Sequence, residues 1–465
     1  MAERVRYICK ECGHVQTGWT GKCPNCGQWA TMEETRISPS KEKRTTTPAQ
    51  KREKAIPLSE VASTSSERMD TGIKELNRVL GGGLVRDSVN MLTARPGAGK
   101  STLLLQLSMN FARQGKDVLY ASGEESAGQV KNRASRLFDQ LSPKIYILST
   151  NAMDEVMDEV FRLHPALLIL DSVQTFQLEE FAQRQGTPTQ TLRVTDKTLE
   201  LSKDPSHPMA SFIVGHMTKS DEMAGLRTIE HLVDTVLYLD DGGDEGLRLL
   251  RSTKNRFGYT GEVGLFQMME KGLMEVRDPY SFFLTKRDRP VTGSAIALQK
   301  EGSRFIPIEI EALVSPSYEP YPMRIGDSLR RDQLNTLVAV LEVRAGYRLD
   351  EKNIVLKATG GIAIKERVTD LAVLVAIASA ADGFFLSATD AFLAEVGLTG
   401  DLKKAEDGER RVQDLSRMGF KRVYVSADFP PAQFDTLELV YCQNLSQVLN
   451  RLKREGKEKK RRLVI

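Results

Sequence analysis

A loop rich in small residues carries the clearest chemistry in the sequence. It consists of Ala94, Arg95, Pro96, Gly97, Ala98, Gly99, Lys100 and Ser101, followed by Thr102. Small residues let backbone N–H groups curl around phosphates, as in phosphate-binding loops. We expect Lys100 to reach the β- and γ-phosphates of ATP and Ser101 to hold Mg²⁺. Ala94 replaces the glycine of the strict pattern, and its methyl group is tolerable where φ is negative.

Carboxylates follow two apolar runs further along the chain. Asp171 ends the run 166–171, where an aspartate is expected to hold the Mg²⁺ shell. Glu124 and Glu125 follow the run 118–122, and ATP hydrolysis needs a carboxylate that positions or deprotonates water. We favour Glu124 with Glu125 in support, although which glutamate is primary stays open. Acidic residues that merely favour a helix N-terminus are the alternative.

A further polar residue, His216, directly follows the apolar run 211–215. It is a candidate sensor of the γ-phosphate, although a lone histidine in such a position is often structural. The segment 220–227 that follows is expected to be a mobile loop.

Four of the five cysteines lie within the first 26 residues, as two Cys-x2-Cys pairs. Cys9, Cys12, Cys23 and Cys26 are predicted to form a closed four-thiolate site for structural Zn²⁺. Trp19 and Trp29 are expected to cover this small module. Cys442 is expected to be a buried thiol.

These groups need strands and helices to position them. Alternating patterns predict strands at 88–93, 118–122, 166–170, 211–214 and 235–239, with a helix directly after the phosphate loop. This alternation is typical of an α/β fold. The expected parts are a zinc module (1–35), a basic linker (36–57), an ATPase domain (58–285) and a third region (286–465). That region should contain a helix at 369–381 and a strand at 422–426.

Composition excludes several classes of protein. Hydrophobic residues make up 40% of the 465, and the net charge is only +3, so the chain is not a general polycation. The start is charged and unlike a signal peptide, and the longest apolar run, 371–381, is too short to span a bilayer. We expect a cytoplasmic protein without a membrane segment. The linker could touch phosphates, although a solvated tether fits its composition better.

The order of these motifs resembles the RadA (Sms) family of bacterial DNA-repair proteins. The resemblance covers essentially the whole chain, from CKECGH through the phosphate loop, SGEES, LLILDSVQT and VGHMTK. Its most diagnostic segment comprises Lys254, Asn255, Arg256, Phe257 and Gly258. Ala94 departs from the family, which usually has glycine there.

The resemblance implies a RecA-like ATPase core assembled as a homo-oligomer, a hexameric ring around DNA. It implies a helicase-like motor for branch migration that works on single-stranded and branched DNA with the recombinase RecA. Lys254 and Arg256 inherit a role near ATP or DNA at subunit boundaries. A solvated basic turn is the alternative, and Lys254 could act in its own subunit, in the neighbour or on DNA.

The third region resembles the α+β protease domain of Lon, in a form that is inactive in this family. By alignment, Val368 takes the place of the nucleophilic serine and Glu409 that of its lysine partner. A Ser–Lys dyad needs both groups, so this region is expected to be a scaffold and a DNA surface. A KaiC-like signalling ATPase, a Lon-type protease and a DNA clamp without turnover are the competing functions.

Overall fold

The computed structural model describes residues 4–37, 67–181, 183–216, 229–241, 246–287, 289–319, 321–359 and 362–463, together with Pro57 and Ser59. The linker expected at 36–57 and the loop expected at 220–227 lie almost entirely outside these residues. Contacts divide the chain into two compact units. The first contains residues 1–239, 250–260 and 270–273, and the second contains 240–249, 261–269 and 274–465. None of the described helices is long and apolar enough to cross a membrane.

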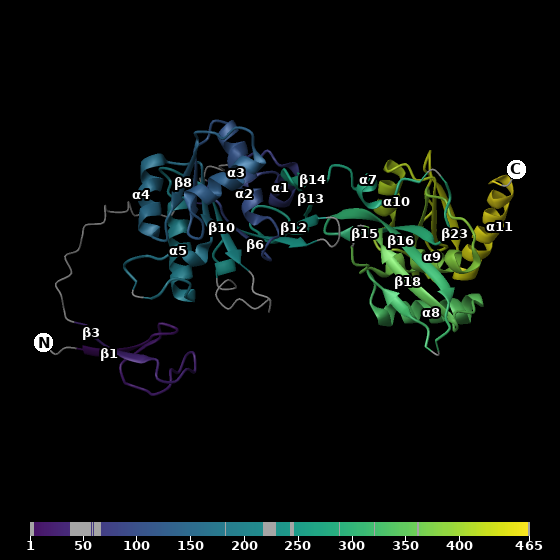
Figure 1. Ribbon diagram of the computed structural model, residues 1–465, viewed down its shortest axis with the longest axis horizontal. Coiled ribbons are helices and arrows are strands. Elements are labelled where there is room, and N and C mark those ends of the chain that lie inside the picture. Colours follow the sequence, from purple (N-terminus) through teal and green to yellow (C-terminus); the bar gives the residue numbers. More distant parts are fainter. Residues whose placement is uncertain are drawn as a thin grey trace. The chain divides into compact units, whose positions relative to one another are not determined.

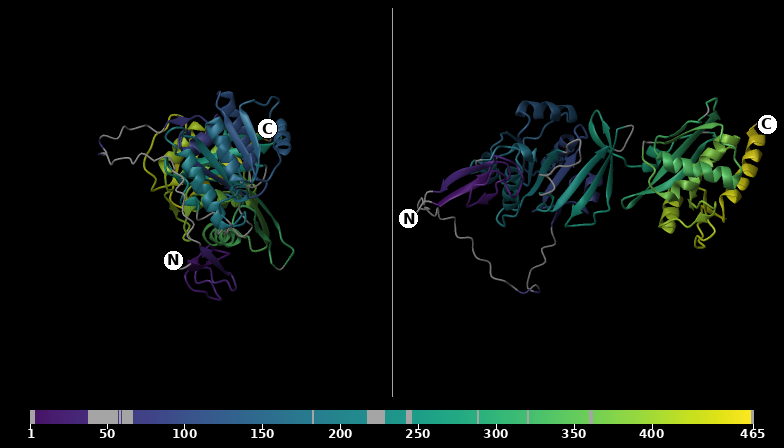
Figure 2. Two further views of the ribbon diagram at one scale, coloured as in Figure 1. Left: turned by 90° about the vertical axis from the view of Figure 1, so that its left-hand side faces the viewer. Right: turned by 90° about the horizontal axis from the view of Figure 1, so that it is seen from below.

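The N-terminal module is a small antiparallel sheet, drawn in purple in Figure 2. Its strands are β1 (Arg4–Cys9), β2 (Val15–Gln16) and β3 (Met32–Ile37), in the order β2-β1-β3. Its small core consists of Cys9, Cys23 and Met32. With so few apolar side chains, such a module depends on a metal for its stability.

The ATPase region is built on a nine-stranded sheet in the order β14-β13-β12-β11-β6-β10-β9-β7-β8 (Figure 1). The strands are β6 (Val89–Ala94), β7 (Val118–Ser122), β8 (Ile145–Ser149), β9 (Leu167–Asp171), β10 (Ala210–His216), β11 (Thr235–Asp241), β12 (Leu247–Asn255), β13 (Val263–Met269) and β14 (Gly272–Glu275). All five strands predicted for this region are confirmed, with ends shifted by up to two residues. Strands β6 to β11 run parallel, so their carboxyl ends share one edge.

Helices surround this sheet. They are α1 (Lys74–Leu80), α2 (Lys100–Arg113), α3 (Ala127–Leu137), α4 (Met153–Leu163) and α5 (Pro188–Ser202). A two-stranded ribbon, β4 (Arg68–Met69) with β5 (Leu84–Val85), and a 3-10 turn, η2 (Val173–Thr175), complete the region. Helix α2 contacts β6, β7, β8 and β9, while α4 and α5 pack with these strands in a separate apolar cluster. The sheet is therefore covered on both faces, which explains its nearly continuous apolar strands.

The second unit has a seven-stranded sheet in the order β17-β18-β16-β15-β19-β22-β23. Its strands are β15 (Ser294–Glu301), β16 (Arg304–Pro316), β17 (Arg324–Gly326), β18 (Lys352–Ala358), β19 (Asp390–Leu393), β22 (Arg422–Ser426) and β23 (Glu438–Cys442), with the separate pair β20 (Glu395–Val396) and β21 (Leu402–Lys403). The helices are α7 (Pro279–Phe283), α8 (Arg331–Ala345), η4 (Arg367–Thr369), α9 (Asp370–Asp382), α10 (Gly408–Arg417) and α11 (Leu445–Leu463). Helix α9 is almost wholly buried against β15 and β16, which explains its apolar sequence (Figure 1). The helix predicted at 369–381 and the strand at 422–426 are confirmed, and Cys442 is buried.

Candidate ATP site and zinc centre

The phosphate loop joins β6 to α2, which begins at Lys100, earlier than expected. Gly97 and Gly99 have φ values of +80° and +108°, which residues with a Cβ rarely adopt. Ala94 is the last residue of β6 and is not among the described non-glycine residues with positive φ. The substitution of glycine by Ala94 is therefore compatible with this loop.

Lys100 is the first residue of α2 and is only 6% exposed. Its Nζ donates to the Ala94 carbonyl at 3.0 Å. Burial lowers the pKa of Lys100, while the nearby carboxylates of Asp171 and Glu124 act to raise it. The structure thus gathers one cation and two carboxylates at the carboxyl edge of the parallel sheet, where α/β proteins bind ligands.

Asp171 ends β9, and two hydroxyls donate to the same carboxylate oxygen, Oδ2. These are Ser101 Oγ at 2.8 Å and the Tyr120 hydroxyl at 2.6 Å. Burial, followed by the charge of Asp171, raises the pKa of Tyr120 well above its usual value, so the phenol keeps its proton. No motif in the sequence marks Tyr120. A tyrosine inside a fully buried strand needs a hydrogen-bond partner, and this requirement was the available signal.

The two glutamates after β7 point to different partners. Glu124 Oε1 accepts a hydrogen bond from Ser172 Oγ at 2.5 Å, directly beside Asp171. Glu125 forms an ion pair with Arg133 of α3, and its backbone N–H donates to Ser122. Glu124 therefore shares the edge with Lys100, whereas Glu125 helps to fasten the start of α3.

His216 is the last residue of β10, and its Cα is in register with that of Ala94 on the neighbouring strand β6. The backbone therefore places it beside the entrance of the phosphate loop. Its side chain lies outside the described residues.

The segment 254–258 lies at the opposite edge of the sheet. Lys254 and Asn255 are the last residues of β12. Lys254 Nζ donates to the carbonyls of Glu230 and His231, both at 2.9 Å. Burial, followed by the charge of Arg256, lowers the pKa of Lys254.

Arg256 connects this segment to the beginning of the phosphate-loop strand. Its guanidinium donates to Asp234 Oδ1 at 3.0 Å, and Asp234 Oδ2 accepts from the Val89 N–H at 3.1 Å. Val89 is the first residue of β6, and the loop follows the last. Five residue steps of about 3.3 Å place Arg256 on the order of 17 Å from its own phosphate loop.

The rest of the segment packs against α1. Arg68 donates to the carbonyls of Phe257 and Leu80, and a Cβ at Gly258 would lie 3.3 Å from Gly81 Cα. This close approach gives a physical reason for glycine at position 258. Neither Arg68 nor Asp234 was identified from the sequence, because no local pattern marks them.

The four cysteines of the N-terminal module converge. Their sulfur atoms all lie within 4.8 Å of one another, and Cys9–Cys26 and Cys12–Cys23 are 3.6 and 3.5 Å apart. A tetrahedral zinc with bonds of about 2.3 Å needs sulfur separations of about 3.8 Å, so the four residues fit Zn²⁺. Burial acts to raise the pKa of Cys9, but hydrogen bonds with Thr31 and backbone groups lower it to about 6. The expected tryptophan cover is wrong: Trp19 and Trp29 are 65% and 72% exposed.

Val368 and Glu409, the two positions aligned with the serine and lysine of Lon, lie in different surroundings in the second unit. Val368 is buried in η4, and Glu409 is exposed in the first turn of α10. Arg411, two residues after Glu409, is fully buried and donates to both carboxylate oxygens of Glu366, two residues before Val368, at 2.7 and 3.1 Å. The segment that would carry a nucleophile is therefore joined to α10 by an ion pair.

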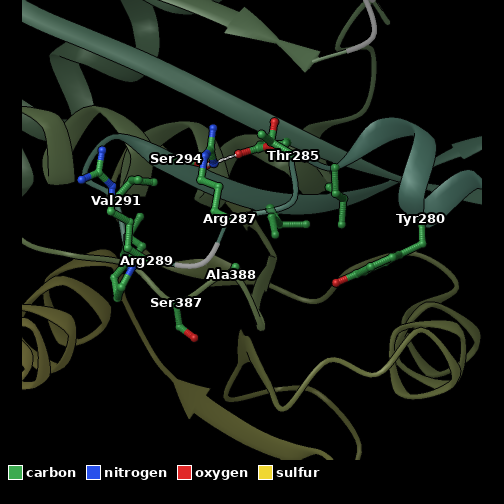
Figure 3. A pocket seen from close by; sticks show the side chains of 13 residues that line it. Tyr280, Thr285, Arg287, Arg289, Val291, Ser294, Ser387 and Ala388 are labelled. Carbon is green, nitrogen blue, oxygen red and sulfur yellow. Dashed lines mark hydrogen bonds and ion pairs between the residues drawn. The ribbon is translucent and has the colours of Figure 1, made fainter.

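A pocket elsewhere in the second unit contains Arg287 and Ser294 (Figure 3). Arg287 donates to Ser294 Oγ at 2.9 Å and forms ion pairs with Glu309 and Glu311. Two carboxylates therefore already neutralise Arg287, while Arg289 also lines the pocket.

Comparison with known proteins identifies the family. An AAA domain model matches residues 55–207, and a rubredoxin metal-binding domain model matches residues 7–34. DNA repair protein RadA of Bacillus subtilis is 38% identical over 91% of this chain and 93% of its own length. RadA of Listeria monocytogenes is 39% identical over 90% and 92%, and that of Streptococcus pyogenes serotype M1 is 38% identical over 96% and 98%. A P-loop ATPase core, a four-cysteine zinc ribbon and this degree of identity along nearly the whole chain show that the protein belongs to the RadA family.

Proposed function

We propose that this protein is a DNA-dependent ATPase that acts as a helicase-like motor in recombinational DNA repair. The observation that carries the proposal is the convergence of Lys100, Ser101, Asp171 and Glu124 at one sheet edge. The relatives' name, DNA repair protein RadA, supports DNA as the partner. The substrate would be single-stranded or branched DNA in the cytoplasm, with branch migration alongside RecA as the outcome.

Each group at the edge has a distinct task in this proposal. Ser101 Oγ and Asp171 are oxygen ligands of the kind that Mg²⁺ prefers, so they would hold the ion of Mg·ATP. Lys100 would neutralise charge on the γ-phosphate. Glu124 would orient and deprotonate the attacking water, because its carboxylate is on the same edge as Lys100. His216 would sense the γ-phosphate from the adjacent strand.

The test of this proposal is DNA-stimulated ATP turnover. Phosphate release should rise when single-stranded DNA is added, and a labelled junction should change its branch position only with hydrolysable ATP. Affinity for DNA should fall steeply with salt, because phosphate contacts release counterions. ATP turnover indifferent to DNA would contradict the motor, and DNA stimulation without branch movement would support a clamp instead.

The second unit would serve as a scaffold and DNA surface, without peptidase activity. Val368 offers no nucleophile, and Arg411 occupies both carboxylate oxygens of the adjoining Glu366. ATP-dependent cleavage of an unfolded protein substrate by the purified chain would contradict this part of the proposal.

Lys254 and Arg256 would act across a subunit boundary of a hexameric ring. Their location at the opposite sheet edge, with Arg256 on the order of 17 Å from its own loop, argues against action on their own ATP. Phosphoryl transfer gains greatly from a cation supplied by a neighbour, which fits a closed ring. Lys254 would leave the carbonyls of Glu230 and His231 to do so.

Subunit mixing tests this placement. Lys254→Ala and Lys100→Ala chains should each be nearly inactive alone. When rings re-form from a mixture, some boundaries pair an intact loop from one chain with an intact Lys254 from the other. The mixture should then exceed both parents. A mixture no better than its parents would place Lys254 at its own subunit's ATP, and normal DNA-free turnover by Lys254→Ala would place it on DNA.

A further inference from the structure

Both tryptophans of the chain lie in the zinc module, and both are exposed. Trp19 is 65% and Trp29 72% exposed, although the chain has only these two tryptophans among 465 residues. Indole rings are usually well buried, because each contributes a large apolar area. Two exposed indoles on so small a module indicate a binding surface.

The two rings approach the same point of the backbone. A Cβ placed on Gly21 would lie 3.7 Å from Cη2 of Trp19 and 3.7 Å from Cζ3 of Trp29. The six-membered parts of both indoles therefore lie close to Gly21, which has no side chain to cover them. We name this surface, formed by Trp19, Gly21 and Trp29, the indole platform.

The segments that carry the rings are fixed to each other. The Ala30 N–H donates to the Gly21 carbonyl at 2.8 Å, and Lys22 forms a β-bridge with Trp29. The Gln16 side chain donates to the Gly18 carbonyl and the Thr20 hydroxyl, both at 2.7 Å, which holds the turn before Trp19. Because hydrogen bonds already fix the backbone that carries the rings, a ligand loses little binding energy in arranging that backbone.

The charge beside the platform is positive. Lys22 Nζ lies 5.8 Å from the centre of the Trp29 ring, within the range of a cation–π contact. Lys22 is the only lysine, arginine, aspartate or glutamate between Gly13 and Ala30. An exposed apolar surface with one adjacent cation matches one nucleotide of a single strand, in which a base stacks and its phosphate meets the ammonium.

We infer that the indole platform binds an unpaired base of single-stranded DNA, as a contact separate from the ATPase core. The inference rests on the proposed function, which makes DNA the partner. Aromatic side chains that stack on bases accept any base, because every base has a π-face. The platform would therefore retain a single strand without selecting its sequence.

Tryptophan emission of the full chain tests the inference, because the platform contains every tryptophan. Titration with a single-stranded oligothymidylate should quench the emission as the indoles stack. An abasic strand of equal length keeps the phosphates but has no bases, so it should leave the emission nearly unchanged. Unchanged emission with oligothymidylate that is shown to be bound, by anisotropy of a label on the strand, would overturn the inference.

Variants separate stacking from folding. Trp19→Ala and Trp29→Ala should each weaken single-strand binding about tenfold, within the range of about fivefold to a hundredfold expected for a lost stacked base. Trp29→Phe should retain most of the affinity, and Lys22→Gln should reduce the salt slope by about one. Phe161→Ala, which removes a 57% exposed aromatic residue of α4 and not of the proposed DNA surface, is the matched control.

The outcomes also separate this inference from the proposed function. Alanine variants that contain a full complement of zinc yet bind single strands like the parent would overturn the inference. The exposed indoles would then be assigned to a protein partner. If DNA still stimulates ATP turnover in those variants, the proposed function stands without the platform. A parent protein that binds no DNA would reject the proposed function itself.

Discussion

In the first unit, the ATP edge consists of Lys100, Ser101, Asp171 and Glu124, and its cation makes few hydrogen bonds. In the second unit, the cation of the Glu366–Arg411 contact makes many. Within the described residues, Lys100 makes one hydrogen bond, to a backbone carbonyl. Arg411 donates to both oxygens of Glu366 and to the carbonyls of Leu298 and Glu406. A buried cation with nearly all of its donors engaged stabilises the fold, whereas one with spare donors can bind phosphate.

The residues around the two cations differ in the same way. Around Lys100, the carboxylates of Asp171 and Glu124 accept hydrogen bonds from hydroxyl groups. A metal ion or a water molecule can replace these hydroxyl donors. Near Arg411, the adjacent charges are paired with each other, as in Lys300 with Asp407 at 2.6 Å. Similar residue types therefore produce a reactive edge in one unit and a closed network in the other.

The largest expected effect comes from removing the cation with spare donors. Lys100→Ala should lower ATP hydrolysis by at least about a hundredfold, because the γ-phosphate loses its main charge partner. Phosphate release at saturating DNA measures the effect. Lys365→Ala, which removes a lysine paired with Glu301 in the second unit, should hydrolyse ATP normally. Equal loss in both variants would show that the contrast between the two regions is wrong.

The paired glutamates refine the comparison within the ATP edge. Glu124→Gln should bind ATP normally and lose about a hundredfold to ten-thousandfold in turnover, the usual contribution of a general base. Glu125→Gln should lose much less, because its carboxylate already pairs with Arg133. Equilibrium binding of a labelled ATP analogue and single-turnover hydrolysis measure the two steps. Normal turnover by Glu124→Gln with a dead Glu125→Gln would reverse the assignment.

Breaking the ion pair between Arg411 and Glu366 should lower the stability of the second unit. Arg411→Met leaves the Glu366 carboxylate without its guanidinium and should lower the free energy of unfolding of the second unit by about 3 kcal/mol. Calorimetry of the full chain measures the loss. The double variant Arg411→Met/Glu366→Gln removes the uncompensated charge and should recover part of it. If the double variant is less stable than the single one, charge pairing does not explain the role of Arg411.

Sequence reasoning located the groups that local motifs specify. The phosphate loop, Asp171 and the four cysteines are marked by spacing and by adjacent apolar runs, so their surroundings could be predicted. Contacts between distant segments could not. Arg411 meets Glu366 across 45 residues, and the exposure of Trp19 depends on how a short turn directs one ring. The periodicity of apolar residues in the sequence does not predict such contacts, because tertiary packing determines each of them.

Removing the Tyr120 hydroxyl should have the smallest effect on ATP hydrolysis. It tests whether this hydroxyl orients the Asp171 carboxylate. Its hydroxyl is buried, keeps its proton because its pKa is raised, and donates to the Asp171 oxygen that also accepts from Ser101. Tyr120→Phe removes this donor while leaving the ring in place. An oxygen of Asp171 that is no longer oriented should hold Mg²⁺ less well.

The expected loss is that of one hydrogen bond to a charged group, about 1.5 kcal/mol or tenfold. It should appear as a higher Mg²⁺ concentration for half-maximal hydrolysis, with kcat nearly restored at saturating Mg²⁺. A merely structural role would instead lower stability and leave the Mg²⁺ dependence unchanged. Tyr146→Phe on the neighbouring strand β8 is the matched control, since Tyr146 pairs with Leu119 in register rather than facing Asp171. If both variants require the same Mg²⁺ concentration as the parent, Asp171 is oriented by its strand alone.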